Sequence, residues 1–457
     1  MKYSILNFLL LLIVTIVLPL FIFFDVNTYF EFLFMSIFVR LVLVFLTPKN
    51  HSVLINNFLN LAQGVYLIII LMMWSHAHND YGVFDISKLF GDSISYFSES
   101  LMMYDEREKT FLELGELSSI NYFLFQYILS KVYYFTTSKY LSALLFVVFT
   151  GLLNLLILFK IGILLNFKKQ TMKIIGVFYI IFPHVLASNT NLLKDSLLVF
   201  SFLLLIYSAI YVVKKKYKNY FKLSVYLVLS LFLCAFIRFP FVILFILIFY
   251  FIVVKNSTNL RNGIIFGLFV FYIMTSFLSS QIDDVIKNAN QIEIGLKSGE
   301  VYGSGFTSLL VGSYASDPFY LKIIKLPLVV IVQYLNPINI FTFSHSNPWS
   351  YIDINLKIIW LLFIGPLYIF CCTQLKSFTP LLKKLLIVSV TGYVLIAYLE
   401  TGIIPRYALL FMCLSILPLA YIFQEMKRNL LLKKKYIYFN RIYFFVAFIL
   451  VFIYIIR

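Results

Sequence analysis

The chain has 457 residues, of which 62% are apolar and only 12% are charged. Soluble domains carry about 25% charged residues, so this composition excludes a water-soluble core and indicates that lipid solvates most of the chain. The formal net charge is +17, but the basic residues form short clusters between apolar segments, which is typical of cytoplasmic membrane anchors and not of a nucleic-acid-binding surface. The cysteines lie inside apolar segments, so neither a disulfide framework nor a zinc site is predicted.

Apolar segments long enough to cross a bilayer as helices recur along the whole chain. They are continuous and do not alternate with polar residues, so helices are favoured over strands. With Lys2 placed inside, the positive-inside rule predicts an all-α polytopic membrane protein with about 13 transmembrane helices. No small-residue cleavage site follows the first segment, which is therefore interpreted as a retained helix and not as a signal peptide. The predicted spans are residues 4–24, 28–47, 54–74, 140–166, 173–188, 193–213, 223–238, 240–254, 262–279, 354–373, 385–400, 406–423 and 441–456.

Two long loops, about 75–140 and 280–353, are predicted to lie on the outer face of the membrane. They contain most of the carboxylates of the chain. Each also contains a stretch, Ser119–Phe135 and Tyr320–Phe341, that is predicted to lie at the membrane interface as an amphipathic helix. Chemistry is therefore expected first on the outer face.

Asp92 is the first catalytic candidate, in residues 91–97 (GDSISYF) shortly after the third predicted span. A carboxylate near the outer membrane surface can act as a general base toward a sugar hydroxyl. Tyr96, four residues later, is a candidate for substrate binding. The alternative is that Asp92 is one of several acids on a solvated loop, in which Asp80 and Asp85 compete for the same role.

Four histidines are further candidates. His76 and His78 stand at alternate positions, which suits a metal site in an extended segment, but no other histidine or cysteine lies nearby in the loop, so an interfacial pair is favoured. His184 is either a substrate ligand or a hydrogen-bonded interfacial side chain. His345 is the only histidine of the second loop, which argues against a metal site there and leaves contact with a glycan or lipid as its functional interpretation.

Basic residues at the outer ends of spans are candidates for binding phosphate. Lys194 and Asp195 lie in a short outer hairpin and, being adjacent, do not share a helix face. The functional interpretation is a lysine for phosphate and an aspartate that positions or activates the acceptor; the alternative is a snorkelling pair. Arg238 and Arg406 stand at outer ends of two further spans, where a guanidinium suits a lipid phosphate or anchors the helix to headgroups.

Over residues 54–420 this order of elements resembles the GT-C class of membrane glycosyltransferases. In that class one span leads into a long outer loop with an acidic residue, six spans follow, and a second long outer loop comes next. Here the third span, the loop with Asp92, six spans between 140 and 279 and the loop from Ser280 have that order. Two additional spans precede the matching part, and the Asp-Glu pair common in parts of the class appears only as Asp105-Glu106.

The resemblance implies a polyprenyl-phosphate-linked sugar as donor, no cofactor, and a site facing the outside or periplasm of a bacterial inner membrane. It implies Asp92 and Asp195 as the acidic pair, and Lys194, Arg238 and Arg406 as phosphate ligands. The implied organisation is two helices in 1–53, a GT-C-like module in 54–353 and C-terminal helices in 354–457. O-antigen and capsule repeat-unit polymerases are also similar in character, which implies membrane lipid, lipid-linked saccharide and a polysaccharide assembly complex as partners.

A flippase or transporter of lipid-linked saccharides is the alternative. Its expected features are internal repeats, charges at mid-membrane positions and broken helices. The ionisable residues of this chain gather at the outer ends of spans and in the two loops, which favours an enzyme.

Overall fold

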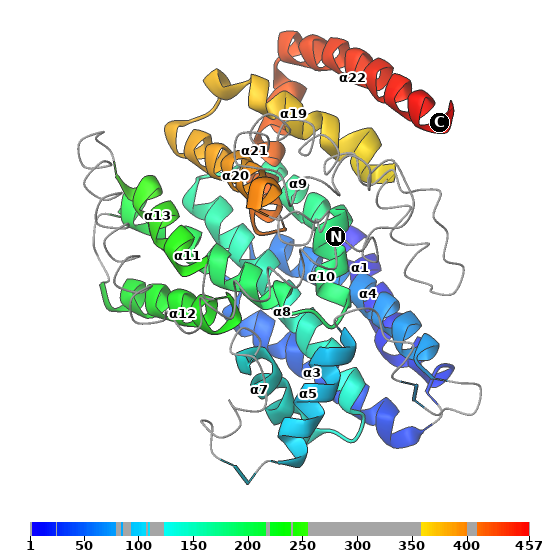
Figure 1. Ribbon diagram of the computed structural model, residues 1–457. Coiled ribbons are helices and arrows are strands. Elements are labelled where there is room, and N and C mark those ends of the chain that lie inside the picture. Colours follow the sequence, from blue (N-terminus) through cyan, green and yellow to red (C-terminus); the bar gives the residue numbers. More distant parts are fainter. Residues whose placement is uncertain are drawn as a thin grey trace. The chain divides into compact units, whose positions relative to one another are not determined.

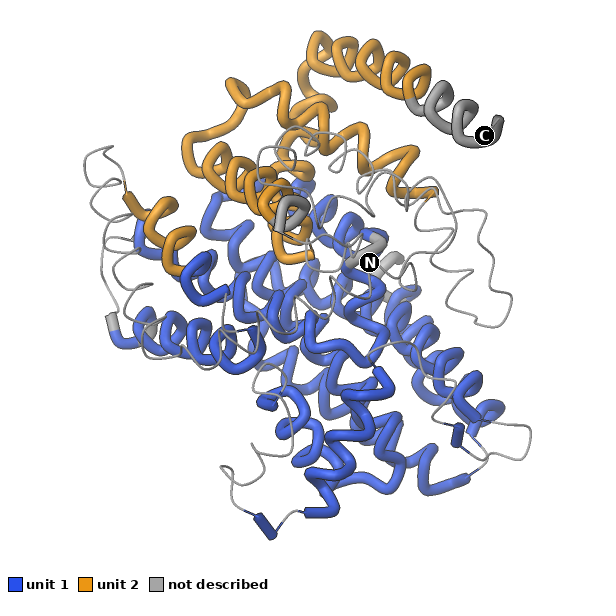
Figure 2. Tube along the Cα trace, in the orientation of Figure 1, with its two compact units in different colours: residues 1–245, 343–356 blue, residues 246–342, 357–457 orange. Residues whose placement is uncertain are grey.

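The computed structural model describes residues 2–23, 25–78, 84–85, 93–106, 108–109, 123–215, 220–238, 241–254, 358–399 and 409–456. The structure is 89% helical and has no strand within these residues, which confirms the all-α prediction for them. They include an isolated β-bridge between His78 and Phe84. The chain divides into two compact units, Met1–Phe245 with Phe343–Leu356, and Ile246–Thr342 with Lys357–Arg457 (Figures 1 and 2).

The first unit is a bundle of helices. Its elements are α1 (Lys2–Leu12), η1 (Ile13–Val17), α2 (Leu18–Leu20), α3 (Val26–Leu46), α4 (Ser52–His76), α5 (Ser93–Asp105), α7 (Phe123–Val132), η3 (Tyr133–Phe135), α8 (Lys139–Leu164), α9 (Lys169–Ile181), α10 (Pro183–Thr190), α11 (Asp195–Lys215), α12 (Tyr220–Arg238) and the start of α13 (Phe241–Val253).

Helix α8 forms the centre of this unit, where it contacts α3, α4, α7, α9, α10 and α11. Its most apolar 18-residue window is 83% buried, whereas the corresponding window of α3 is only 22% buried although both are strongly apolar. Phe34, Phe38 and Phe45 on α3 are accordingly exposed. An apolar helix with an aromatic outer face is stable where lipid covers that face, so α3 is suited to the edge of a membrane bundle.

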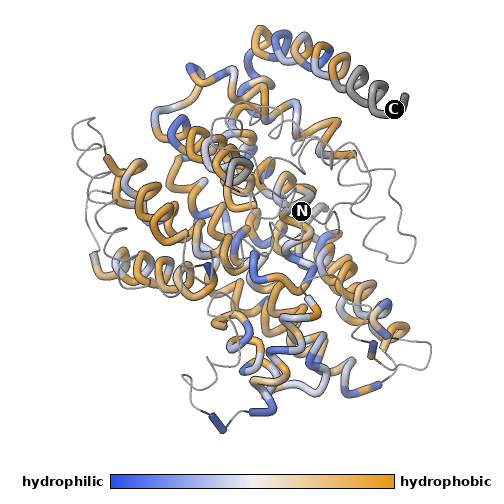
Figure 3. The backbone as a smooth tube through the Cα atoms, in the orientation of Figure 1, coloured by the Kyte–Doolittle hydropathy of each residue, from blue (hydrophilic) through white to orange (hydrophobic). Residues whose placement is uncertain are grey.

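Five helices among the described residues are long and apolar enough to cross a membrane, namely α3, α4, α8, α11 and α21. Figure 3 shows the apolar residues that dominate the long helices. These helices indicate a membrane protein, but they are fewer than the spans predicted from hydropathy. The predicted span 262–279 and the interfacial stretch Tyr320–Phe341 lie outside the described residues.

Several predicted spans take a different form. Residues 173–188 were expected to form one span, but α9 ends at Ile181 and α10 begins at Pro183. Proline lacks an N–H and disfavours a helical residue before it, and Phe182 is indeed extended, with φ −72° and ψ 117°. Helix α13 has 13 residues, or about 20 Å, which is shorter than a hydrocarbon core of about 30 Å.

The ends of α3, α4 and α8 gather in two places. The α3–α4 turn and the α8–α9 turn both line one pocket, through His51 and Asn166 among others. The start of α3, the end of α4 and the start of α8 line a different cavity. Helices α4 and α8 therefore run antiparallel, and ends assigned to the same side of the membrane lie together.

The second unit contains the end of α13, η5 (Trp360–Ile364), α19 (Gly365–Thr373), η6 (Leu375–Ser377), α20 (Pro380–Leu399), α21 (Leu409–Arg428) and α22 (Leu430–Ile456). Helices α20 and α21 approach closely at Gly392, where an added Cβ would lie 2.1 Å from the ring of Phe411. Ser389 Oγ donates a hydrogen bond of 2.7 Å to the carbonyl of Phe411 beside it. Helix α22 begins well before the predicted span 441–456.

Candidate functional site at the α10–α11 hairpin

Lys194 and Asp195 lie where the chain turns from α10 into α11. The carbonyl of Lys194 accepts hydrogen bonds from the backbone N–H groups of Leu197 and Leu198, at 3.0 and 3.1 Å, so α11 starts here. The two residues are only 3% and 4% exposed. Burying ionisable groups is costly, and near a membrane such groups usually serve a function. Their burial makes this hairpin the main candidate for a functional site.

The Lys194 side chain reaches the C-terminal end of α12. Its Nζ donates to the carbonyl oxygen of Ile237 at 3.5 Å, and Arg238 is the next residue. A helix C-terminus carries unpaired carbonyls and a partial negative charge, which favours a cation there. The guanidinium carbon of Arg238 lies 5.2 Å from the centre of the Phe241 ring. Two predicted phosphate ligands, Lys194 and Arg238, therefore belong to the same small region.

Asp195 is the acidic residue in the first turn of α11. A carboxylate at a helix N-terminus is stabilised by the helix dipole and by nearby N–H groups. Lys194 precedes it directly. The hairpin therefore holds a carboxylate and an ammonium group within one buried turn, which is the combination predicted for activating an acceptor and binding a phosphate.

Helix α5 brings part of the first long loop, 75–140, to this hairpin. Ser93 Oγ donates a hydrogen bond of 3.2 Å to the carbonyl of Leu192, two residues before Lys194. Ser93 directly follows Asp92 in the sequence, although Asp92 itself lies outside the described residues. Tyr96, on the same helix, is 3% exposed and packs edge-to-face against Phe125 with ring centres 5.6 Å apart.

Helix α5 is held in place by α7, the segment predicted as an interfacial helix. Gln126 Nε2 donates to Glu99 Oε2 at 2.6 Å, and Ser100 Oγ and the Tyr133 hydroxyl are hydrogen-bonded at 2.8 Å. Burial raises the pKa of the Tyr133 hydroxyl, so it stays protonated near neutral pH. Helix α7 in turn contacts α8 and α12. The first loop is thus anchored to the helices that carry the hairpin.

A buried polar network on α8 holds the start of α11 in place. Asn154 Nδ2, in α8, donates to the carbonyl of Ser196 at 2.9 Å, and Ser196 Oγ donates to Thr150 Oγ1 at 3.0 Å. All three residues are at most 3% exposed. In a low dielectric such hydrogen bonds fix geometry strongly, because breaking one leaves an unsatisfied group. They set the position of Asp195 relative to α8.

A second branch of the network centres on Asn189, in α10. Its Nδ2 donates to the hydroxyls of Tyr66 and Tyr179, each at 3.1 Å, and the Tyr179 hydroxyl donates to the carbonyl of Gly151 at 2.6 Å. A Cβ on Gly151 would lie 2.5 Å from Asn189 Cγ, so only glycine permits this approach. These hydrogen bonds link α4, α8 and α9 to α10, the first helix of the hairpin.

The remaining predicted site residues are distributed as follows. His184 is the second residue of α10, so its backbone is near the hairpin, but its side chain lies outside the described part of the structure. Arg406 and His345 also lie outside it. Sequence reasoning missed Asn154, Asn189 and Thr150. The sequence feature that could have indicated them is an uncharged polar residue within a long apolar segment, such as Asn154 in α8.

The candidate metal ligands His76 and His78 serve other contacts. His76 is the last residue of α4, so the segment is not extended as a metal site would need. His78 Nδ1 lies 2.7 Å from the Trp74 carbonyl, and its ring stacks on the indole with centres 3.7 Å apart. Within the described residues, no three histidine, cysteine or acidic side chains are grouped as a metal site.

Comparison of the chain with known protein families, with curated proteins and with solved structures finds no match. The chemistry of the hairpin therefore rests on its own residues. A buried ammonium, a neighbouring guanidinium and a carboxylate at these helix ends can bind an anionic group and hold a proton acceptor beside it.

Proposed function

We propose that this protein is a GT-C-type glycosyltransferase of the bacterial inner membrane, acting on its outer face in the assembly of a surface polysaccharide such as O-antigen or capsule. The donor would be a sugar or oligosaccharide on polyprenyl phosphate or pyrophosphate. The same chemistry serves the transfer of one sugar and the polymerisation of repeat units. The observation that carries the proposal is the buried hairpin, where Lys194 contacts the end of α12 beside Arg238.

In the proposed reaction, an acceptor hydroxyl attacks the anomeric carbon of the donor sugar while the bond from that carbon to the phosphate oxygen breaks. Asp92 takes the proton of the attacking hydroxyl, and Asp195 positions the acceptor. The electron pair of the broken bond leaves with the polyprenyl phosphate. Lys194, Arg238 and Arg406 stabilise the negative charge that develops there. Attack from the opposite side inverts the sugar carbon.

One observation favours the alternative, a flippase. Arg40 lies within α3, where its Nη2 donates to Asn56 Oδ1 at 2.9 Å. Its Nη1 is buried and has no hydrogen-bond partner in the part of the chain that the structure describes. Beside it, the first helix contains the π-helical turn η1. An intramembrane charge is a feature of transporters, and π-helical turns occur often at functional sites, so Arg40 is the residue on which this alternative depends.

Surface-polysaccharide profiles separate the two functions. Cells would carry the wild type, a deletion, Lys194→Met, Asp195→Asn or Arg40→Met, with membrane levels of each protein measured. Lys173→Met is the matched control, because Lys173 is an exposed lysine on α9. The transferase proposal expects loss of long chains or of one sugar with Lys194→Met and Asp195→Asn and a normal profile with Lys173→Met. If only the deletion and Arg40→Met change the profile, the proposal is wrong and transport is favoured.

A further inference from the structure

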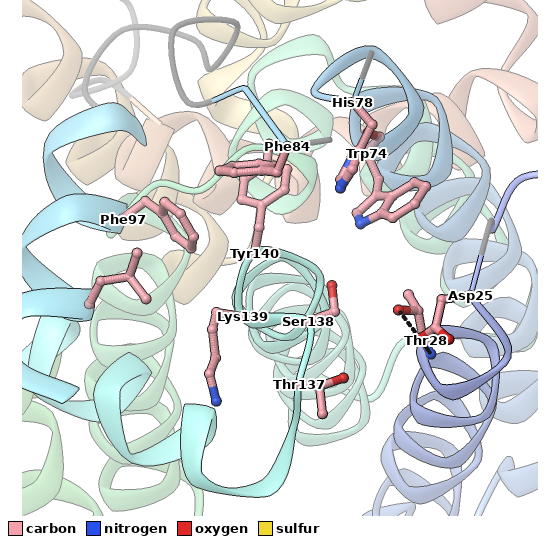
Figure 4. Close-up of a pocket in the computed structure, with 11 residues that line it drawn as sticks. Asp25, Thr28, Trp74, His78, Phe84, Phe97, Thr137, Ser138, Lys139 and Tyr140 are labelled. Carbon is pink, nitrogen blue, oxygen red and sulfur yellow. Dashed lines mark hydrogen bonds between the residues drawn. The ribbon is translucent and has the colours of Figure 1, made fainter. Parts of the chain in front are cut away.

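A cavity of about 350 Å³ lies beside the proposed site, at the ends of α3, α4 and α8 (Figure 4). Ligand pockets typically occupy about 300 to 1,000 Å³, so this cavity is at the small end of that range. Helix α5 connects it with the hairpin, because Ser93 contacts Leu192 and Phe97, one helical turn later, lines the cavity. These two positions of α5 are about 6 Å apart along the helix axis.

Aromatic rings form a continuous wall of this cavity. Phe84, Phe97 and Tyr140 pack against one another with ring centres 5.2 to 5.5 Å apart. The His78 ring is 5.4 Å from Phe84 and stacks on Trp74. Rings packed in this way are rigid, and they offer an apolar surface to the C–H groups of a ligand. The wall therefore suits a ligand with a flat apolar face.

A hydrogen-bond donor at one end of this wall needs an acceptor. Trp74 is 4% exposed, and its Nε1 has no hydrogen-bond partner within the described residues. Figure 4 shows this nitrogen directed into the space between Tyr140 and Ser138. The indole is fixed by His78 on one side and by Phe23, whose ring centre is 4.7 Å away. An indole N–H only donates, so it calls for a ligand oxygen.

The charges around the cavity disfavour a phosphate there. Lys139 lines the cavity. Its Nζ, however, donates to the carbonyls of Tyr133 and Thr136, at 2.5 and 2.6 Å. Figure 4 shows the side chain directed away from Trp74. Asp25 also lines the cavity. Its pKa is held below the ordinary value of 3.8, chiefly by the backbone N–H of Thr28, so it is charged at neutral pH. A phosphate in this cavity would be repelled by the Asp25 carboxylate, and the Lys139 ammonium is already bound to backbone carbonyls.

The geometry points to a binding site for a single sugar unit, with the pyranose ring against the aromatic wall and a ring hydroxyl accepting from Trp74 Nε1. A sugar has apolar C–H faces and an edge of hydroxyls that both donate and accept. The hydroxyls of Thr137 and Ser138 and the Asp25 carboxylate supply complementary partners on the rim. That this sugar is part of a lipid-linked substrate rests on the proposed function; that the cavity binds a sugar does not.

Direct binding of methyl glycosides to the purified full-length protein tests this inference. The protein would be held in lipid nanodiscs, since glycoside detergents would compete for the cavity. Saturation-transfer difference NMR would be recorded with the methyl glycosides of hexoses, N-acetylhexosamines and a 6-deoxyhexose, up to about 100 mM. That limit lies above the millimolar dissociation constants expected of a small pocket with few hydrogen bonds.

Trp74→Phe keeps an aromatic ring but removes the N–H, and Ser138→Ala removes one rim hydroxyl. Each is expected to weaken the binding of at least one glycoside by about three- to tenfold, as the loss of one neutral hydrogen bond implies. Trp360→Phe is the matched control, since Trp360 is a buried tryptophan of the second unit. Lys173→Met, at an exposed lysine on α9, is expected to bind the free glycoside as the wild type does.

Two results would overturn the inference: no glycoside in the panel binds the wild type, or both Trp74→Phe and Ser138→Ala bind as tightly as the wild type. The fate of the proposed function is decided separately. If glycosides bind as expected while cells with Lys194→Met make normal polysaccharide, the sugar site stands and the transferase proposal fails. If no glycoside binds but Lys194→Met cells lose their long chains, the cavity assignment fails alone.

Discussion

The α10–α11 hairpin and the aromatic cavity adjoin the same helix, α5, but they differ in what surrounds them. The hairpin buries Lys194 and Asp195, with Arg238 at the helix end that Lys194 contacts. The cavity is lined by rings, hydroxyls and one carboxylate, and its lysine is engaged elsewhere. The hairpin is suited to a charged ligand group, and the cavity is suited to a neutral ligand surface with a few hydroxyl groups.

The difference matches the two halves of one amphiphilic molecule. A lipid-linked saccharide has a phosphate that needs cations and a sugar that needs a flat apolar wall with hydrogen-bond partners. Substitutions in the hairpin should therefore act on chemistry, and substitutions in the cavity should act on the affinity for sugar.

Lys194→Met should have the largest effect. It removes the buried ammonium that would stabilise the departing phosphate, and loss of one such donor costs about 10² to 10³ in rate. Lys194→Arg should restore part of the activity, because a guanidinium also binds phosphate. Glycan synthesis by isolated membranes, normalised to protein level, is the measurement. Equal activity of Lys194→Met and wild type would remove Lys194 from the chemistry.

Gly151→Ala should disturb the hairpin through its scaffold. The new Cβ would lie 2.5 Å from Asn189 Cγ, so Asn189 must move and its hydrogen bonds to Tyr66 and Tyr179 weaken. Such overpacking costs about 1 to 3 kcal/mol. Gly64→Ala is the matched control, since its Cβ would meet only Leu10 at 3.6 Å. Thermal unfolding in nanodiscs should therefore start at a lower temperature for Gly151→Ala alone.

Trp74→Phe should reduce glycan synthesis only modestly, by about three- to tenfold, and mainly at low concentrations of lipid-linked substrate. A loss confined to the apparent KM fits a sugar contact that is equally strong in the ground state and the transition state. Synthesis would be followed in membranes at graded substrate concentrations. A fall in kcat with an unchanged KM would instead assign Trp74 to the hairpin chemistry.

Asp25 should have the smallest effect on folding stability, and only in acid. Its Oδ2 accepts from the N–H of Thr28 at 3.0 Å at the start of α3, which lowers the pKa of the carboxyl. The stability from this cap is present above the unfolded-state pKa and is lost as pH falls through the lower folded-state pKa, below about 4. The difference in melting temperature between pH 7 and pH 3 should shrink in Asp25→Asn, which keeps a cap. An unchanged difference would show that other groups govern the acid response.

The sequence predicted the helical class, a helix that includes Phe123–Val132 and the polar hairpin, because hydropathy and charge are local properties. It did not predict the break between α9 and α10, although Pro183 was its signal. It also missed α5, whose sequence mixes serines and acids with apolar residues and shows no long apolar run. Local patterns indicate which segments lipid can cover, and they say less about helices that pack on other helices.

The contacts of the site required the folded chain. Lys194 and Ile237 are 43 residues apart, and Ser93 and Leu192 are 99 apart. Residue type suggested Lys194 and Arg238 as phosphate ligands, but their shared location follows from how α11 packs on α12. The cavity was not visible in the sequence, since its walls come from the ends of several helices and Trp74 is an unremarkable residue at the end of an apolar span.

The most direct test of the central claim is release of polyprenyl phosphate or pyrophosphate by the purified protein. Lipid-linked saccharide from cells that lack the protein would be placed with it in proteoliposomes, and the released lipid and the glycan product would be measured by mass spectrometry. Release is expected with the wild type and Lys173→Met, and none above background with Lys194→Met. Transbilayer movement of intact lipid-linked saccharide without any release, equal in wild type and Lys194→Met, would contradict the central claim.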